Sequence, residues 1–222
     1  MHYLWYRLAT TLKNILSPEF IPWYLIAILA TWIIVATGFD GQYFSLVRDS
    51  VPSVFFSLAG MLGFFVPILL WATLMVTGTI LKQKKTVMAA WMSAQAGFLG
   101  FGLSSFIKIF TGRLPPPHTW VSATDAIAAS HGFQFGILRG GVFWGWPSSH
   151  TTTAFAMSIA LLVFYRDKKL FGLIVILYAL YIAIGASMSF HWLSDVVFGI
   201  VFGTIIGLSV GRTFNSESLK KD

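Results

Sequence analysis

Six apolar stretches, each long enough to cross a bilayer as a helix, constrain this chain more than any other feature. They run at about 20–37, 54–81, 86–110, 147–165, 170–187 and 191–210. A helix needs roughly 20 apolar residues to span the hydrocarbon core, where the backbone must satisfy its own hydrogen bonds. Only 10% of the residues are charged, compared with about 25% in soluble domains. The sequence therefore predicts an all-α integral membrane protein, folded as a six-transmembrane-helix bundle.

The positive charges are divided unequally between the segments that connect these stretches. Six spans place both termini on one side, and eleven of the fifteen Lys and Arg residues fall there. The other side holds only Arg48, Lys108, Arg113 and Arg139. On that side the segment 38–53, which contains Asp40 and Arg48, is expected to be a polar link between the first two stretches. Because cytoplasmic loops carry the excess of Lys and Arg, we expect an N-in/C-in, multi-pass protein of the cell membrane (the inner membrane if the source is bacterial). The net charge of +7 forms no basic stripe, so no nucleic acid partner is predicted.

The two ends of the chain flank this bundle. Residues 2–16 place leucine and isoleucine side chains at helical spacing, with Arg7 and Lys13 among them, which indicates a short interfacial amphipathic helix. We predict an interfacial segment at 1–19, one membrane domain at 20–212 and a cytoplasmic tail at 213–222. Cysteine is absent, so neither disulfides nor thiolate metal sites are expected.

A histidine and a carboxylate stand four residues apart at the start of the last apolar stretch, as His191 and Asp195. In a helix they would share a face, so Asp195 could accept a hydrogen bond from one ring nitrogen and leave the other free as base or nucleophile. Ionisable residues in membrane-type sequence are costly and indicate function by default. Polar residues also join membrane helices, so a structural His–Asp pair remains open at this point.

The predicted topology brings further polar residues to the same outer side. Lys108, Arg113, Arg139 and His150 all fall there. The four cations of this side, converging with His150 and His191, form a plausible site for a phosphate group. Ser148 and Ser149 follow Pro147 at the expected start of the fourth helix, where backbone N–H groups and the helix dipole favour an anion. An ordinary N-cap is the commoner use of such serines.

Three motifs follow one another along the chain: Lys108-Ile-Phe-Thr-Gly-Arg113-Leu-Pro-Pro, Pro147-Ser148-Ser149-His150 and His191-Trp-Leu-Ser-Asp195. They resemble Lys-x6-Arg-Pro, Pro-Ser-Gly-His and Ser-Arg-x5-His-x3-Asp, the motifs of the type 2 phosphatidic acid phosphatases (PAP2), which share their site with vanadium haloperoxidases. The order of the motifs, the six spans and the long loop between the first two are similar to the membrane-bound branch, over about 54–211.

This resemblance implies a role for each site residue. His191 would attack phosphorus and form a phosphohistidine, with Asp195 orienting it. His150 would protonate the leaving oxygen and later activate water. The phosphoryl oxygens would be held by Lys108, Arg113, Ser148 and backbone amides near Ser149.

The chain departs from the family pattern at three positions. Pro115 stands where the first motif has its Arg, Gly185 where the third motif has its Arg, and Ser149 where the second motif has Gly. Arg139 in the long loop could replace one missing arginine, a hypothesis that rests on its charge and its side of the membrane. His118 and His131 are interpreted as ordinary loop residues.

The leading interpretation is therefore a membrane-embedded phosphatase that cleaves a lipid phosphate or diphosphate at the extracytoplasmic face. Candidate substrates include phosphatidate, phosphatidylglycerophosphate, undecaprenyl diphosphate and a lipid A phosphate. Two alternatives stay open: a phospholipid-headgroup transferase with the same His–His–Asp set, and a non-catalytic lipid-phosphate binder or transporter. No cofactor and no metal are expected, because no carboxylate cluster suited to Mg²⁺ falls on the outer side. The sequence leaves the oligomeric state open.

Overall fold

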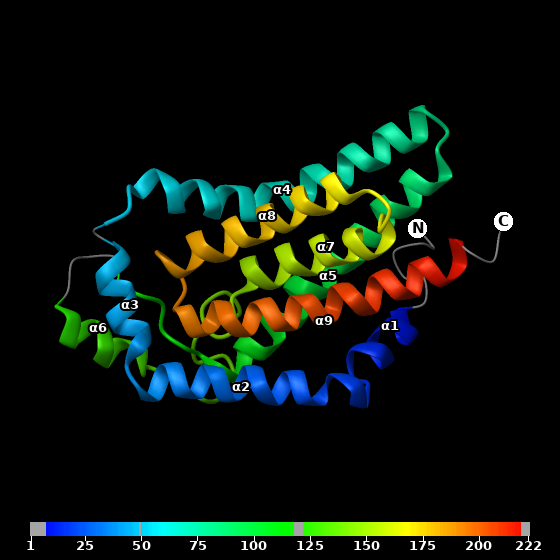
Figure 1. The fold of residues 1–222 in the computed structure, drawn as a ribbon. Helices are drawn as coiled ribbons and strands as arrows, with labels where there is room; N and C mark the ends of the chain where they lie inside the picture. Colours follow the sequence, from blue (N-terminus) through cyan, green and yellow to red (C-terminus); the bar gives the residue numbers. More distant parts are fainter. Residues whose placement is uncertain (1–7, 49, 118–121, 219–222) are drawn as a thin grey trace.

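The helices of the fold, shown in Figure 1, follow the apolar stretches of the sequence. This computed structural model describes residues 8–48, 50–117 and 122–218, and all regular elements within them are helical. Arg7 and His118, named above, lie outside these ranges, as do Lys220 and Lys221 of the predicted cytoplasmic tail. The elements are α1 (Leu8–Ile15), the 3-10 turn η1 (Pro18–Phe20), α2 (Ile21–Ala36), α3 (Phe39–Arg48), α4 (Ser53–Ile80), α5 (Lys84–Thr111), α6 (Ala123–Ser130), α7 (Ser149–Phe164), α8 (Lys169–Ser187) and α9 (Leu193–Ser218).

Helix α7 lies at the centre of the bundle and packs most closely against α9. Four glycines spaced four residues apart on α9 face α7, and a Cβ at Gly203 or Gly207 would lie 2.5 Å or 2.6 Å from a carbonyl oxygen of α7. Small residues let membrane helices approach backbone to backbone. The contact fixes the first turn of α7 beside that of α9. The four glycines are Gly199, Gly203, Gly207 and Gly211.

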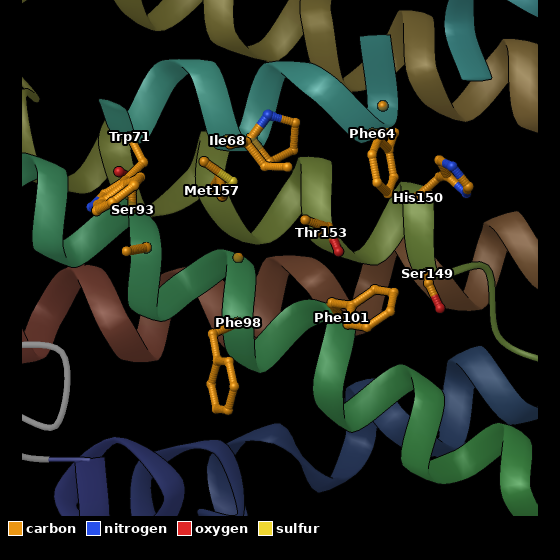
Figure 2. Close-up of a pocket in the computed structure, with 14 residues that line it drawn as sticks. Phe64, Ile68, Trp71, Ser93, Phe98, Phe101, Ser149, His150, Thr153 and Met157 are labelled. Carbon is orange, nitrogen blue, oxygen red and sulfur yellow. The ribbon is translucent and has the colours of Figure 1, made fainter. Parts of the chain in front are cut away.

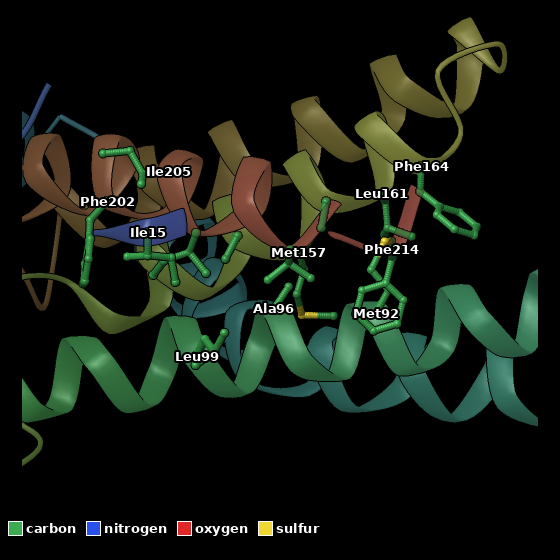
Figure 3. Packing of buried hydrophobic residues seen from close by; sticks show 14 of the residues in the cluster. Ile15, Met92, Ala96, Leu99, Met157, Leu161, Phe164, Phe202, Ile205 and Phe214 are labelled. Atoms are coloured by element: carbon green, nitrogen blue, oxygen red, sulfur yellow. The ribbon is translucent and has the colours of Figure 1, made fainter. Parts of the chain in front are cut away.

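The apolar core fills the space between α5, α7 and α9 (Figure 3). Met92 and Leu99 of α5 meet Met157 and Leu161 of α7, and α9 contributes Phe202, Ile205 and Phe214. Ile15 of α1 is part of this cluster. The short first helix therefore packs onto the bundle. Whether it also lies in the membrane interface stays a prediction.

The outward faces of the long helices are strongly apolar. Trp32 of α2, Phe65 of α4 and Leu177 of α8 are at least half exposed, as suits helices that face lipid. Four helical segments are long and apolar enough to cross a membrane: Pro18–Ala36, Ser53–Ile80, Lys169–Ser187 and Leu193–Asn215. These helices are compatible with a multi-pass membrane protein.

The third and fourth predicted spans are also helical, as α5 and α7, but neither is among those four candidates. Helix α7 has only 16 residues, which is about 24 Å of helix. Helix α5 has 28 residues and carries three lysines, Lys84, Lys85 and Lys108. The six-span count and the N-in/C-in orientation therefore stay predictions.

The two ends of the bundle differ in the chain segments that they hold (Figure 1). Helix α1, the α4–α5 turn and the α7–α8 turn gather at one end with the C-terminal part of α9. The opposite end holds α3, α6 and the first turns of α7 and α9. The segment 38–53, expected as a polar link, instead contains the ten-residue helix α3, and the long connection after α5 contains α6.

Candidate active site

The site forms where α7 and α9 begin side by side. The backbone N–H of Ser148 donates to the carbonyl oxygen of Asp195 at 3.1 Å, which ties the two helix starts together. The rings of His150 and His191 consequently lie close, with centroids 6.4 Å apart. Phe190 packs against both rings, at 5.0 Å from His150 and 5.7 Å from His191. Two histidines far apart in the sequence therefore lie near each other.

His191 is oriented by Asp195, although the two residues do not share a helix. His191 lies in the turn between α8 and α9, and its backbone N–H donates to the carbonyl oxygen of Ala186 at 3.0 Å. Its Nδ1 is 3.3 Å from one oxygen of Asp195, which also accepts the Trp192 N–H at 3.1 Å. The expected i, i+4 helical geometry was thus wrong in detail, because α9 begins only at Leu193. Since Nδ1 faces Asp195, Nε2 is the nitrogen left for chemistry.

The electrostatic surroundings of His191 favour its neutral form. Burial lowers the pKa of His191 below its ordinary value, and the positive charges of Lys108 and Arg113 act in the same direction. The hydrogen-bonded carboxylate of Asp195 opposes them. Only a neutral imidazole nitrogen has the lone pair needed for nucleophilic attack.

His150 stands in the first turn of α7, at one end of an apolar cavity of about 460 Å³ (Figure 2). The cavity lies between α4, α5 and α7, and Trp71 and Ser93 mark its far end. Gly63 of α4 makes room for the imidazole, because a Cβ there would lie 2.9 Å from the ring of His150. Most of the lining is apolar: Phe64, Pro67, Ile68, Phe98, Phe101 and Met157. Among those residues Phe64, Ile68 and Phe98 are more than half exposed, so the cavity meets the apolar outer surface.

Arg113 forms a buried ion-pair network on the other side of the histidines. Its two terminal nitrogens donate to the carboxylates of Asp195 and Asp40, the latter at 2.6 Å. They also donate to the Ser194 hydroxyl at 2.7 Å and the Ser130 carbonyl at 2.6 Å. These four bonds use all four of their hydrogens. Only the Nε–H is left, and it has no hydrogen-bond partner in the described chain.

Lys108 is buried, and its Nζ donates to the carbonyl oxygen of Phe143 at 2.8 Å. That single bond leaves two of its three N–H donors for other groups. Ser148 caps α7 by accepting from the Thr151 N–H at 3.4 Å, which is the ordinary use of a serine at this position. Ser149 lines the cavity beside His150, with its Oγ 2.9 Å from the Oγ of Ser104.

The family model of the PAP2 superfamily matches residues 87–217, which is more than half of the chain and includes all three motifs. The chain belongs to the PAP2 superfamily. Membership points to phosphatase-type activity on phosphate esters. No curated protein and no solved structure matches the chain.

The fold explains one departure from the PAP2 motifs. Gly185, which stands in place of the third-motif Arg, lies where α8 crosses α4, and a Cβ there would overlap the Cβ of Ala59. No long side chain fits at that contact. Arg113 already pairs with Asp195, so positive charge reaches the third motif from the end of α5.

Arg139, expected to replace a missing PAP2 arginine, is exposed in the loop before α7, with its side chain against Gly136. No hydrogen bond or ion pair joins it to the site within the described residues, and its role in phosphate binding stays a prediction. His131 is also exposed, and its Nδ1 lies 2.7 Å from the Ile127 carbonyl of α6. In the same part of the chain, no group of three His, Asp or Glu residues converges as metal ligands would.

Two site residues were missed from the sequence. Asp40 and Ser194 complete the network around Arg113, and both are fully buried. Asp40 was noted only as part of a polar link. The available signal was a carboxylate next to a glycine, flanked by apolar residues on the cation-poor side of the chain.

Proposed function

We propose that this PAP2 protein is a membrane-embedded lipid phosphatase, which hydrolyses a phosphomonoester or pyrophosphate bond of a lipid through a phosphohistidine intermediate. The observation that best supports this proposal is the position of His150, which stands at the end of an apolar cavity with its ring centroid 6.4 Å from that of His191. A lipid tail fits such a cavity, and its phosphate would then meet both histidines. A soluble phosphate ester would gain nothing from the apolar lining.

The proposed reaction has two steps. In the first, Nε2 of His191 attacks phosphorus, the bond from phosphorus to the lipid oxygen breaks, and His150 gives that oxygen a proton. In the second, His150 takes a proton from water, the resulting hydroxide attacks phosphorus, and the phosphorus–nitrogen bond breaks to release inorganic phosphate. Asp195 stabilises the positive imidazole ring of the intermediate through Nδ1–H.

The phosphoryl oxygens need donors that strengthen as negative charge shifts in the transition state. Lys108 is the first candidate, because its charge acts on His191 and two of its N–H donors are free of the Phe143 bond. The first-turn N–H groups of α7, near Ser149, are the second. Arg113 can add at most its Nε–H while its network is intact.

The proposed orientation places this site at the extracytoplasmic face. Its support is that α1 and the Lys-bearing turns between α4 and α5 and between α7 and α8 lie at the end of the bundle opposite to the histidines. Such Lys-rich segments are cytoplasmic in most membrane proteins. The phosphate would be released outside, while the dephosphorylated lipid stays in the membrane.

The test is phosphate release by purified protein from phosphatidate, phosphatidylglycerophosphate, undecaprenyl diphosphate and lipid A in detergent micelles, with and without an acceptor alcohol. We expect turnover of at least one of them, and a loss of about 10³-fold or more in His191→Ala, because the nucleophile is gone. His131→Ala is the matched control, since that exposed histidine lies in a loop. Release that survives in His191→Ala would contradict the mechanism.

The same assay separates the alternatives. Transfer of the phosphoryl or headgroup to the acceptor alcohol, without release of phosphate, would indicate a transferase. If neither wild type nor His191→Ala turned over any lipid, but a lipid phosphate still bound to the protein, the result would indicate a binder or transporter.

A further inference from the structure

The carboxylate of Asp40 is fully buried and accepts three hydrogen bonds. The residue lies in α3, outside the part of the chain that matches the PAP2 family model. One of its oxygens accepts the backbone N–H of Ser194 at 2.8 Å, and the other accepts the Ser194 hydroxyl and an Arg113 nitrogen, both at 2.6 Å. Its three donors come from α9 and from the end of the first motif.

Local packing brings Asp40 to this place. The next residue, Gly41, lies against the backbone of α6, where a Cβ would come within 2.6 Å of the carbonyl carbon of Ala126. One helical turn later, Phe44 packs edge-on against the fully buried ring of Trp192, with centroids 5.6 Å apart. Helix α3 therefore packs between α6 and Trp192, the residue that follows His191.

The charges of this cluster act on His191 through Asp195. Arg113 carries one positive charge and is paired with two carboxylates, Asp40 and Asp195. The three groups together therefore carry a net charge of about −1 in a buried site, where charges act strongly. Without Asp40, Arg113 and Asp195 would form a neutral pair, and little negative charge would remain to stabilise a positively charged imidazole.

We propose that Asp40 is a positioning residue for the reaction: it holds Arg113 and Ser194 and balances the charge of Arg113, so that Asp195 keeps its negative charge available to His191. This inference rests on the proposed function for its kinetic consequence. It adds to the three family motifs a fourth element, supplied by a helix that the sequence predicted as a link.

The kinetic consequence falls on kcat. Asp40 touches neither the cavity nor Lys108, so the binding of the lipid should change little. Both steps pass through a positively charged ring of His191, and each should slow when Asp195 is neutralised by Arg113. For Asp40→Asn, which keeps the shape of the side chain, we expect kcat to fall by on the order of 10², with KM within about threefold of wild type.

The experiment compares wild type, Asp40→Asn and the control Asp125→Asn in phosphate release from phosphatidate and undecaprenyl diphosphate micelles. Asp125 is an exposed carboxylate on α6 whose only described bonds are local, so its loss should leave kcat unchanged. The single variant Arg113→Gln and the double variant Asp40→Asn/Arg113→Gln add a second measure. Because the double variant removes both the unbalanced cation and its partner, its loss should be smaller than the product of the two single losses.

A second readout does not depend on turnover. The ring of His191 is titrated by NMR in histidine-labelled protein, where it faces Asp195, Lys108, Arg113 and His150. We expect the midpoint to move to lower pH in Asp40→Asn, because less negative charge supports the protonated ring. A melting temperature measured on each variant separates this effect from loss of the fold.

The outcomes are separable. If wild type is active and Asp40→Asn keeps its kcat, the role of Asp40 is refuted while the proposed function stands. If wild type is inactive on every lipid, the proposed function fails, and an unchanged His191 midpoint would then also refute the role of Asp40. If Asp40→Asn does not fold, Ser194→Ala takes its place, since the Ser194 hydroxyl bridges Asp40 and Arg113. We expect a loss of about tenfold in its kcat, and an unchanged kcat would refute the proposal.

Discussion

The two sides of the histidine pair differ sharply in what they offer a ligand. On the side of α3 and α6, Asp40, Arg113, Ser194 and Asp195 bond to one another and are almost completely buried. On the side of α4 and α5, a cavity of about 460 Å³ is lined largely by aromatic and aliphatic side chains. One side has the polar groups but little space, and the other has space but few polar groups.

This difference separates chemistry from recognition. Buried ion pairs hold their geometry when their polar groups are hydrogen-bonded. In this network all four hydrogens on the terminal nitrogens of Arg113 are bonded and only its Nε–H lacks a partner among the described residues, so the polar side can orient His191 in the same way for every substrate. Under the proposed function, the apolar side would meet the part of the substrate that varies. Substitutions on the polar side should therefore lower turnover of all substrates alike, whereas substitutions in the cavity should change the choice of lipid.

Among the substitutions that test this comparison, the largest effect is expected for Lys108→Met. The variant removes a cation whose charge acts on His191 and which we propose binds the phosphoryl group, so kcat/KM should fall by about 10²–10³ for lipid and soluble phosphate esters alike. Because the charge of Lys108 lowers the pKa of His191, its loss should also raise that pKa. The acidic limb of the pH–rate profile, where His191 becomes protonated and inactive, should then move to higher pH. A loss confined to long-chain substrates would assign Lys108 to the cavity side instead.

Gly41→Ala should be the next most damaging. Its added methyl group meets the backbone of α6, which cannot move aside as a flexible side chain would, so we expect a cost of about 1–3 kcal/mol in stability. Thermal unfolding in detergent measures this cost, and kcat should fall as α3 shifts Asp40. Gly102→Ala is the control, because its added methyl group would meet no heavy atom of another element within 4 Å. Equal melting temperatures for the two variants would contradict the close contact between α3 and α6.

Ala94→Phe tests the cavity side. A phenyl group at this lining position should occupy the space of a lipid tail, raising KM for a long-chain phosphatidate about tenfold, an effect near 1.4 kcal/mol. A soluble ester such as p-nitrophenyl phosphate should be turned over as before. Ala36→Phe, an exposed position at the end of α2, provides the matched control. If both substrates suffered equally, the cavity would not be the tail site.

The smallest effect is expected for Thr153→Val, also in the cavity wall. The hydroxyl of Thr153 is buried without a hydrogen-bond partner in the described chain, so replacing it by a methyl group of similar shape should leave stability unchanged or raise it by up to about 1 kcal/mol. Unfolding in detergent gives the answer directly. A clear destabilisation would show that the hydroxyl has a polar partner after all.

Much of the fold was predictable because the length of each apolar stretch can be read directly from consecutive residues of the sequence. The six stretches became α2, α4, α5, α7, α8 and α9, with boundaries close to those expected except at the end of α9, which continues to Ser218 instead of ending near 210. The exceptions arose where tertiary contacts decide. The segment around Asp40 forms a ten-residue helix that is stabilised by packing on α6 and Trp192. Because no local pattern reveals these contacts, the segment was predicted as a link.

The candidate site was predictable to the same extent. His191 and Asp195 were recognisable from their spacing and His150 from the motif Pro147-Ser148-Ser149-His150, and the structure brings the three residues together. The partners of Arg113 were not recognisable, because Asp40 is 73 residues away in the chain. Arg113, which was predicted to bind phosphate, is paired with two carboxylates in the structure, and its part in phosphate binding stays a prediction. Only the folded chain shows which anion an arginine meets.

The cavity reaches the outer apolar surface through Phe64, Ile68 and Phe98, and this has a consequence for how turnover would be measured. A substrate that enters sideways is drawn from the two-dimensional pool of the membrane, so its mole fraction among the surrounding lipids sets the rate. Adding inert lipid at a fixed total amount of substrate would slow such an enzyme, even though nothing in the aqueous phase had changed.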